Sequence, residues 1–293
     1  MAPLDFLVIG AQKCATTWLH ECLREHPELG LPKHKLEMEY LGGDLYQDRG
    51  AAWYFSQFPP APHARARGHV SVEYLADPRA PAVIHEHMPD VKLIVSLRDP
   101  VDRAISAFYW YVRKGKVPQM ALEDGMRRAL RAYDTHDPEQ EAFRDLIERG
   151  LYAQQIERYL AFFEAGQFLV IDYENVRRSP SDVLTRITSF LGVDPAFRPR
   201  SIDTRPKLNS RIDLLTRLQR RVPESRVAGK VFDLAHQALH RVLPTTSRPT
   251  LDAALERELR SVFRTDGERL GQLFERMHQA TGDLRLSWRR TST

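Results

Sequence analysis

The stretch VIGAQKCATTWL, residues 8–19, places a lysine and two threonines after an apolar run that ends in glycine. A loop that leaves a buried strand and enters a helix presents free backbone N–H groups, which bind anions together with the positive end of the helix dipole. Lys13 adds a cationic side chain, and Thr16 and Thr17 add hydroxyl donors. The stretch therefore predicts a site for a phosphate-like group. A surface lysine beside two capping threonines is the alternative interpretation.

This loop differs from the triphosphate-binding motif G-x-x-x-x-G-K-[ST], because no second glycine precedes Lys13. That motif wraps a β-phosphate and presents a hydroxyl to magnesium, so its absence argues against a kinase or an NTPase. A second anion site is indicated by SLRDPVDRAISAFYW, residues 96–110, where Arg98 ends a predicted strand and Ser106 lies in the second turn of the next helix. Helical side chains lean toward the helix N-terminus, so Arg98 and Ser106 can converge on one phosphate.

The elements that position these residues follow from alternating hydrophobic periods. Continuous apolar runs at 4–10, 91–97 and 167–173 predict strands that are buried on both faces. Apolar residues at helical spacing follow or precede each run, and Asp99 with Pro100 suits a helix N-cap and first helical position. Strands that alternate with helices predict an α/β fold with a parallel sheet.

After Gly192 the composition shifts toward proline and arginine, which indicates a loop. Helical segments are expected at roughly 210–243 and 250–280, and their apolar stripes need a surface to cover. We therefore expect one domain over residues 1–293, with C-terminal helical additions from about 207 to 293.

Composition narrows the class of protein. The chain has 293 residues, of which 42% are hydrophobic and 28% charged, as expected of a globular protein. A net charge of +4 is compatible with anionic ligands but does not indicate nucleic-acid binding. No apolar run approaches the roughly 20 residues that span a bilayer, and the first residues lack the features of a secretory signal, so we expect a cytoplasmic protein. Cys14 and Cys22 are expected on one helix, about two turns apart and too far to bridge, which fits a reducing compartment.

The two anion-site segments also carry a family resemblance. FLVIGAQKCATTWLHECLREHPEL resembles the 5′-phosphosulfate loop of sulfotransferases that use 3′-phosphoadenosine 5′-phosphosulfate (PAPS). KLIVSLRDPVDRAISAFYWYVRKG is similar to the segment that binds the 3′-phosphate in those enzymes. The heparan-sulfate, Golgi-type branch and its soluble bacterial relatives match best, and the resemblance extends to the terminal GDLRLSW. It implies a P-loop-like central parallel sheet flanked by helices, with additional C-terminal helices.

The resemblance implies a role for individual residues. Lys13 would be catalytic and contact the bridging oxygen as the sulfuryl group leaves. Arg98 and Ser106 would bind the 3′-phosphate, and Tyr152 in RGLY would lie near the nucleotide, with core packing as the competing role. Lys207 and Arg211, in KLNSRIDLL, match loosely a basic loop over the 3′-phosphate. The 5′-phosphosulfate would be bound by the loop and first helical turn, which comprise Gln12, Lys13, Cys14, Ala15, Thr16 and Thr17.

The general base is expected in KLEMEYL, residues 35–41, where the resemblance aligns Glu37 with the glutamate that deprotonates the acceptor. Glu39 and a histidine such as His34 are the alternatives. The segment departs from the family pattern, because Leu36 replaces the usual lysine, and Lys35 is the residue that can substitute for it. Without the resemblance, Glu37 and Glu39 are two carboxylates in a polar loop.

These observations predict an enzyme that moves the sulfuryl group from PAPS to a hydroxyl or amine of a small-molecule, saccharide or natural-product acceptor and releases 3′-phosphoadenosine 5′-phosphate (PAP). No metal is required, and no nucleic acid or membrane is an expected partner. A non-catalytic PAP-binding protein and, with less support, a nucleotide kinase are the alternatives. His85 and His87 make a poor metal pair because residues two apart on a helix face different sides.

Overall fold

The computed structural model describes residues 4–58, 61–203 and 250–281. Its centre is a sheet of five strands in the order β2-β3-β1-β4-β5, and every pairing between neighbours is parallel. The strands are β1 (Phe6–Gly10), β2 (Leu29–Gly30), β3 (Ala66–Val70), β4 (Lys92–Leu97) and β5 (Phe168–Asp172). The three predicted strands correspond to β1, β4 and β5, so the parallel α/β fold is confirmed. The strands β2 and β3 were not predicted.

Alternate residues of β1 point to opposite faces of the sheet, as the two-residue period of a strand requires. Leu7 and Ile9 pack in one buried cluster, whereas Phe6 and Val8 pack in another. The first cluster includes residues of α2 (Asp44–Ser56), α3 (Glu73–Ala76), α4 (Ala80–His87), α8 (Tyr152–Leu160) and the C-terminal half of α13 (Ala253–Thr281). The second includes residues of α1 (Thr16–Arg24), α9 (Tyr173–Arg178) and α10 (Pro180–Leu191).

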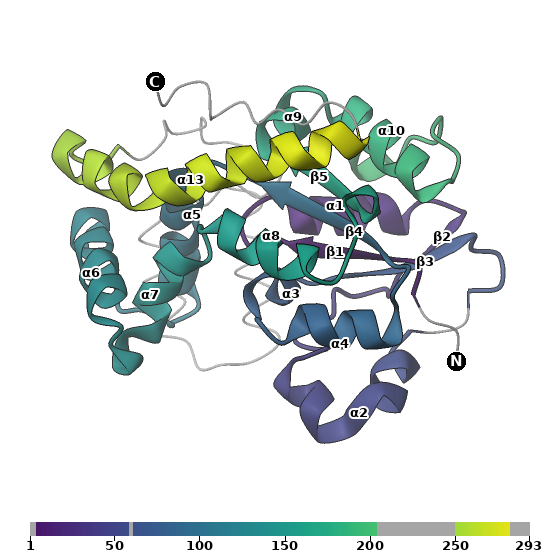
Figure 1. The fold of residues 1–293 in the computed structure, drawn as a ribbon, viewed down its shortest axis with the longest axis horizontal. Helices are drawn as coiled ribbons and strands as arrows, with labels where there is room; N and C mark the ends of the chain where they lie inside the picture. Colours follow the sequence, from purple (N-terminus) through teal and green to yellow (C-terminus); the bar gives the residue numbers. More distant parts are fainter. Residues whose placement is uncertain (1–3, 59–60, 204–249, 282–293) are drawn as a thin grey trace.

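A third buried cluster lies beside the sheet and joins α5 (Pro100–Arg113), α6 (Leu122–Thr135) and α7 (Glu141–Glu148) to the N-terminal half of α13. Single-turn 3₁₀ helices occur at η1 (Pro138–Gln140), η2 (Ala165–Gln167) and η3 (Arg200–Asp203). The predicted helix at 250–280 is α13, the long helix of Figure 1. Its N-terminal half packs in the third cluster and its C-terminal half in the first. The predicted helix at 210–243 lies outside the described residues, and the single-domain organisation stays a prediction.

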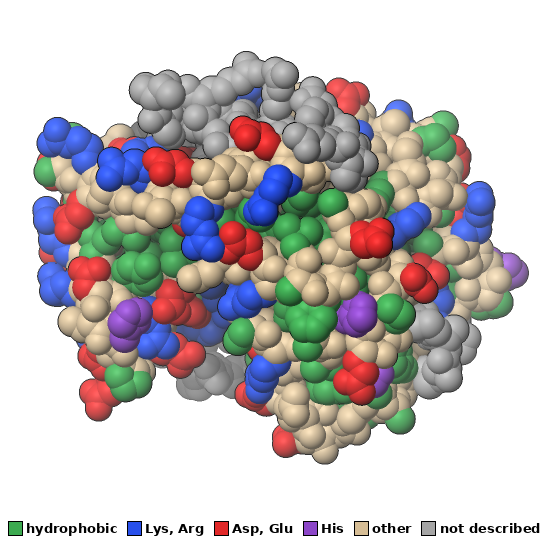
Figure 2. Space-filling model, in the orientation of Figure 1, with side chains coloured by type: hydrophobic (Ala, Val, Ile, Leu, Met, Phe, Trp, Pro, Cys, Tyr) green, Lys and Arg blue, Asp and Glu red, His purple; other side chains and the backbone are tan. Residues whose placement is uncertain are grey.

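The surface is mixed in charge. Figure 2 shows basic and acidic side chains interspersed over the visible face, in keeping with the small net charge of +4. None of the helices in the described ranges is both long and apolar enough to cross a membrane.

The carboxyl ends of β1, β3, β4 and β5 lie at one edge of the sheet, because all four strands are parallel. The chain leaves this edge through the loop 11–15, through Ser71 and Val72, through Arg98 and Asp99, and directly into α9. Loops at the carboxyl edge of an open α/β sheet are where such folds bind ligands. The fold therefore brings both predicted anion sites to the same edge.

Candidate active site

The loop between β1 and α1 is built for a close approach to an anion. The Ala11 N–H donates to the Ser96 carbonyl on β4 (2.8 Å), which fixes the start of the loop, and Lys13 and Ala15 have positive φ angles of 69° and 66°. Ala15 is the N-cap of α1 and supplies no side-chain cap, so the first N–H groups of the helix keep no side-chain acceptor there. Gly10 is needed at the end of β1, because a Cβ there would lie 2.9 Å from the Leu75 Cβ. An uncapped helix N-terminus is a site for an anion.

Lys13 is held beside other cations. Its Nζ lies 5.8 Å from the centre of the Trp110 ring. Burial and, to a smaller extent, the positive charges of Arg113 and Arg98 together lower the pKa of Lys13 to about 8, while Glu37 acts in the opposite direction. Positive charge that is crowded in this way is stabilised by an anionic ligand.

Arg98 lies directly after β4, and its guanidinium is only partly paired. Its guanidinium lies 4.6 Å from the centre of the Tyr173 ring, and its Nη2 is 4.0 Å from the Asp102 carboxylate. Its Nε is buried and has no hydrogen-bond partner among the described residues. Ser106 lies half-buried in the second turn of α5, as expected, and Asp99 and Pro100 are the N-cap and first residue of that helix. Of the predicted 3′-phosphate residues, Arg98 thus lies just before α5 and Ser106 lies within it.

The loop that contains the predicted base lies over the same edge of the sheet. The Lys35 ammonium donates to Thr16 Oγ1 (3.2 Å), on the first turn of α1, and to a carboxylate oxygen of Glu37. Lys35 is largely buried and Glu37 is 41% exposed, so the carboxylate keeps access to solvent. The negative charge of Glu37 also acts on Lys13, whose pKa it raises.

The alternative bases, Glu39 and His34, make fewer contacts than Glu37. Glu39 is half-exposed and His34 is exposed, and neither has a hydrogen bond or an ion pair within the described residues. Of the three candidates, Glu37 is the one that is tied to α1, through Lys35. The role itself stays a prediction.

Cys14 is a buried residue of the loop, and its side chain faces Tyr152 in the core. Cys14 is in the loop, two residues before α1, so the expectation that both cysteines share one helix was wrong. Its thiol donates to the Gln12 carbonyl (3.5 Å) and lies 3.9 Å from the Tyr152 hydroxyl. Burial raises the pKa of the Cys14 thiol to about 11. Tyr152 is 1% exposed, which fits core packing under the loop, the competing role named for it.

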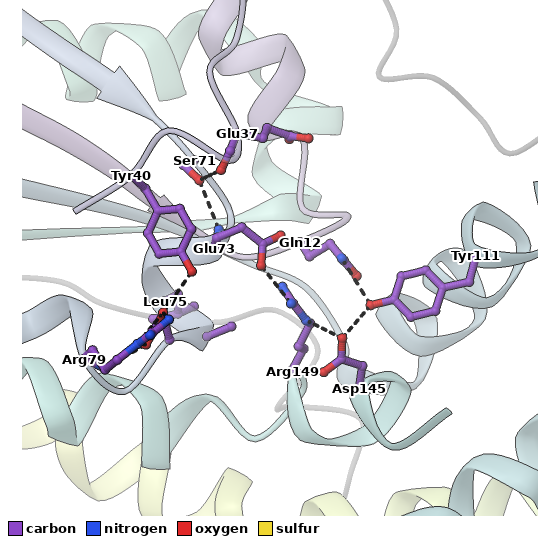
Figure 3. Close-up of polar contacts among 12 residues, drawn as sticks. Gln12, Glu37, Tyr40, Ser71, Glu73, Leu75, Arg79, Tyr111, Asp145 and Arg149 are labelled. Carbon is purple, nitrogen blue, oxygen red and sulfur yellow. Dashed lines mark hydrogen bonds and ion pairs between the residues drawn. The ribbon is translucent and has the colours of Figure 1, made fainter. Parts of the chain in front are cut away.

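Sequence reasoning missed a polar network that starts at Gln12 (Figure 3). The Gln12 amide donates to the Tyr111 hydroxyl (3.4 Å), which donates to Asp145 (3.0 Å). Arg149 joins Asp145 (3.1 Å) to Glu73 (2.8 Å). The network links the anion loop to α5, α7 and the start of α3. Its residues are far apart in sequence and match no short motif, so only the fold brings them together.

The remaining sequence predictions concern Lys207, Arg211 and two histidines. Lys207 and Arg211 lie outside the described residues. His87 Nε2 is 2.8 Å from the Tyr46 hydroxyl, and His85 packs against Phe163. In the described part of the chain no cluster of three or more His, Cys, Asp or Glu could hold a metal ion.

Comparison with known proteins identifies the family. The model of the sulfotransferase domain family matches residues 3–207, more than half of the chain. The chain belongs to the sulfotransferase domain family. Enzymes of this family use PAPS as the sulfuryl donor. The recognition made from the two anion-site segments is thereby confirmed.

Sequence relatives of this sulfotransferase domain include heparan-sulfate enzymes. The chain is 33% identical over 199 residues to the mouse bifunctional heparan sulfate N-deacetylase/N-sulfotransferase 4 (Mus musculus). This match covers 66% of the chain and 22% of that protein. It is 32% identical over 190 residues to the human heparan sulfate glucosamine 3-O-sulfotransferase 6 (Homo sapiens), which covers 64% of the chain and 52% of that protein. The chain thus matches about half or less of the length of these relatives.

A solved structure supports the fold over most of the length. The sulfotransferase from Alicyclobacillus acidocaldarius is 25% identical, with a TM-score of 0.66, and the match covers 94% of this chain and 97% of that one. The residues of the present sulfotransferase domain also fit PAPS chemically. The uncapped start of α1, the crowded Lys13 ammonium and the buried, unpaired Nε of Arg98 are groups that would be satisfied by the phosphosulfate or a phosphate of PAPS.

Proposed function

We propose that the chain transfers the sulfuryl group of PAPS to a hydroxyl or amine of a small-molecule, saccharide or natural-product acceptor, and that PAP is released. The observation that carries this proposal is the meeting of Lys13, the uncapped start of α1 and Glu37 at one edge of the sheet. One cation, one set of backbone donors and one carboxylate are the groups that an in-line sulfuryl transfer requires.

PAPS supplies an activated sulfuryl group, whose leaving group is a phosphate. Lys13 would hold positive charge where that phosphate gains negative charge, and a fixed cation in a partly dehydrated site acts strongly on such a change. Thr16 and the first N–H groups of α1 would bind the 5′-phosphosulfate, and Arg98 would bind the 3′-phosphate through its unpaired Nε.

Glu37 would accept the proton of the acceptor on a carboxylate oxygen. Its partner Lys35 also bonds to Thr16, so the base is tethered to the first turn of the phosphate-binding helix. This tether orients the base relative to the donor site, and orientation is a large part of general-base efficiency.

The acceptor is the open part of the proposal. The printed names of two relatives refer to heparan sulfate, which supports a saccharide as the first class to test. A screen of labelled sulfate transfer from PAPS to saccharides, lipids, phenols and peptide natural products, run without magnesium, would identify it. A non-catalytic PAP-binding protein would bind PAP and transfer no sulfate. A kinase would need magnesium and a nucleoside triphosphate.

The base assignment is tested with two matched variants. Glu37→Gln keeps the size of the side chain but cannot accept the proton, so we expect turnover to fall about 100- to 10,000-fold with near-normal PAP affinity. Glu39→Gln is the control and should stay close to wild type. Normal turnover of Glu37→Gln would show that the base is another residue.

A further inference from the structure

The end of β3 is connected to the loop that carries Glu37 by two side chains. His69 Nε2 lies 2.6 Å from the Leu36 carbonyl oxygen, and Ser71 Oγ donates to the Glu37 carbonyl oxygen (2.7 Å). Residues 69 and 71 are two positions apart along an extended chain, so their side chains leave on the same side. They therefore contact the two backbone carbonyls that flank the Glu37 Cα.

The protonation of His69 follows from its partners. A carbonyl oxygen only accepts hydrogen bonds, so Nε2 must carry the proton that goes to Leu36. Burial lowers the pKa of His69 to about 3, which keeps the ring neutral, and Nδ1 is then an acceptor. Nδ1 lies 2.8 Å from the Tyr74 hydroxyl and 3.3 Å from the Tyr54 hydroxyl, and we assign the nearer hydroxyl, that of Tyr74, as its donor.

The chain of hydrogen bonds continues into the core. Because Tyr74 donates its one hydroxyl proton to His69, its oxygen accepts a hydrogen bond from the Tyr54 hydroxyl, 2.6 Å away. His69, Tyr54 and Tyr74 are each 1% exposed or less. Their donors consequently run in one direction, from Tyr54 through Tyr74 and His69 to the Leu36 carbonyl. A buried polar chain with fixed donors costs free energy to rearrange, so it holds its end point rigidly.

We propose that His69 is a positioning residue that fixes the backbone of residues 36–37 and thereby the direction of the Glu37 carboxylate. This inference rests on the proposed role of Glu37 as the base. His69 does not touch the reacting groups. Its neutral ring supplies a hydrogen bond whose geometry is set by the core, and Ser71 supplies the second one from the same strand end.

Two amide variants of His69 separate a positioning role from a packing role. In His69→Gln the amide nitrogen reaches the place of Nε2 and keeps the bond to Leu36, whereas in His69→Asn it reaches only the place of Nδ1. Both replace a buried ring by a smaller amide, so their loss of stability should be similar. His26→Asn is the remote control, because His26 is also buried and its Nε2 lies 3.0 Å from the Asp194 carbonyl, beyond the far end of α1.

Three measurements are made on each full-length variant. They are PAP affinity by calorimetry, turnover with the acceptor found in the screen, and hydrogen exchange of residues 35–39 with PAP bound. For His69→Asn we expect turnover to fall about 10- to 100-fold, since a shift of about 1 Å in a catalytic group has this effect. Exchange at 35–39 should rise, because the segment opens more often, while PAP affinity stays within about twofold.

The comparison between the variants decides the question. His69→Gln should keep turnover within about threefold of wild type and should not raise exchange, and His26→Asn should leave both unchanged. Equal losses in His69→Gln and His69→Asn, or no loss in His69→Asn, would overturn the proposal. If the His69 variants do not fold, Ser71→Ala tests the second contact and should raise exchange at the same residues.

Failure of the proposed function would look different. If wild type transfers no sulfate to any acceptor, or if Glu37→Gln keeps full turnover, the base assignment fails. The exchange measurement still decides then whether His69 holds the segment.

Discussion

The pKa of Lys13 gives a pH dependence of donor binding that can be worked out in advance. Burial lowers this pKa to about 8, and the groups that act on the ammonium are Arg113, Arg98, Cys14 and Glu37. The arginines stay charged at all accessible pH values, and the phosphates of PAP are fully ionised above about pH 7. Lys13 is therefore the group near the donor site that loses charge as the pH rises through about 8.

The magnitude follows from the fraction of charged Lys13. With a pKa of about 8, about nine-tenths of the lysine is charged at about pH 7 and about one-tenth at about pH 9. If only the charged form makes its contact, PAP affinity falls roughly tenfold across this interval. The total loss at higher pH is limited to the value of one charge-assisted contact, about 1.5–3 kcal/mol.

Calorimetric titration of PAP at several pH values measures this effect. Lys13→Met should bind PAP more weakly at about pH 7, and its affinity should no longer change up to about pH 9. Lys33→Met is the matched control, because Lys33 is exposed, and it should retain the wild-type pH profile. A flat profile in wild type, or an unchanged slope in Lys13→Met, would refute the placement of Lys13 at the phosphosulfate.

Two further outcomes are expected. Arg98→Ala should remove most of the preference for PAP over adenosine 5′-phosphate, about tenfold or more, since each charge-assisted phosphate contact contributes roughly 1.5–3 kcal/mol; equal affinity of wild type for both nucleotides in calorimetry would contradict the 3′-phosphate site. The thiols of Cys14 and Cys22 should not react with a thiol reagent in the native protein at about pH 8, because both are buried with raised pKa values. Rapid labelling of Cys14 before unfolding would show that the loop opens to solvent.

The strands that could be predicted from the sequence are those with continuous apolar runs. The strands β1, β4 and β5 are buried on both faces and carry such runs. By contrast, β3 has the sequence ARGHV, and its polar and small residues have local reasons. A Cβ at Gly68 would lie 2.2 Å from the Phe6 ring, and His69 serves a hydrogen bond to Leu36 that is 33 positions away. Requirements set by distant residues leave no periodic pattern, so β3 was missed.

The two predicted anion sites could be proposed from the sequence for a related reason. Each lies within one strand, loop and helix, so the residues that converge are close in sequence. The network of Gln12, Tyr111, Asp145, Arg149 and Glu73 lacks this property, because its members come from the loop after β1 and from α5, α3 and the C-terminal end of α7. Short-range spacing can therefore indicate where the donor binds, while the surroundings of the acceptor depend on long-range packing.

The base segment shows how a departure from the family pattern is accommodated. Leu36 packs against the first buried cluster, and Lys35, on one side of it, bonds to Glu37, on the other side, and to Thr16. Side chains one position apart in an extended segment point to opposite sides, so a lysine at 36 would face the core, whereas a lysine at 35 shares the side of Glu37. The cation is thus displaced by one position in sequence but still lies beside the carboxylate. A segment that had lost its function would have no reason to keep a largely buried lysine between the phosphate-binding helix and the carboxylate, and this favours the catalytic interpretation over a non-catalytic PAP-binding protein.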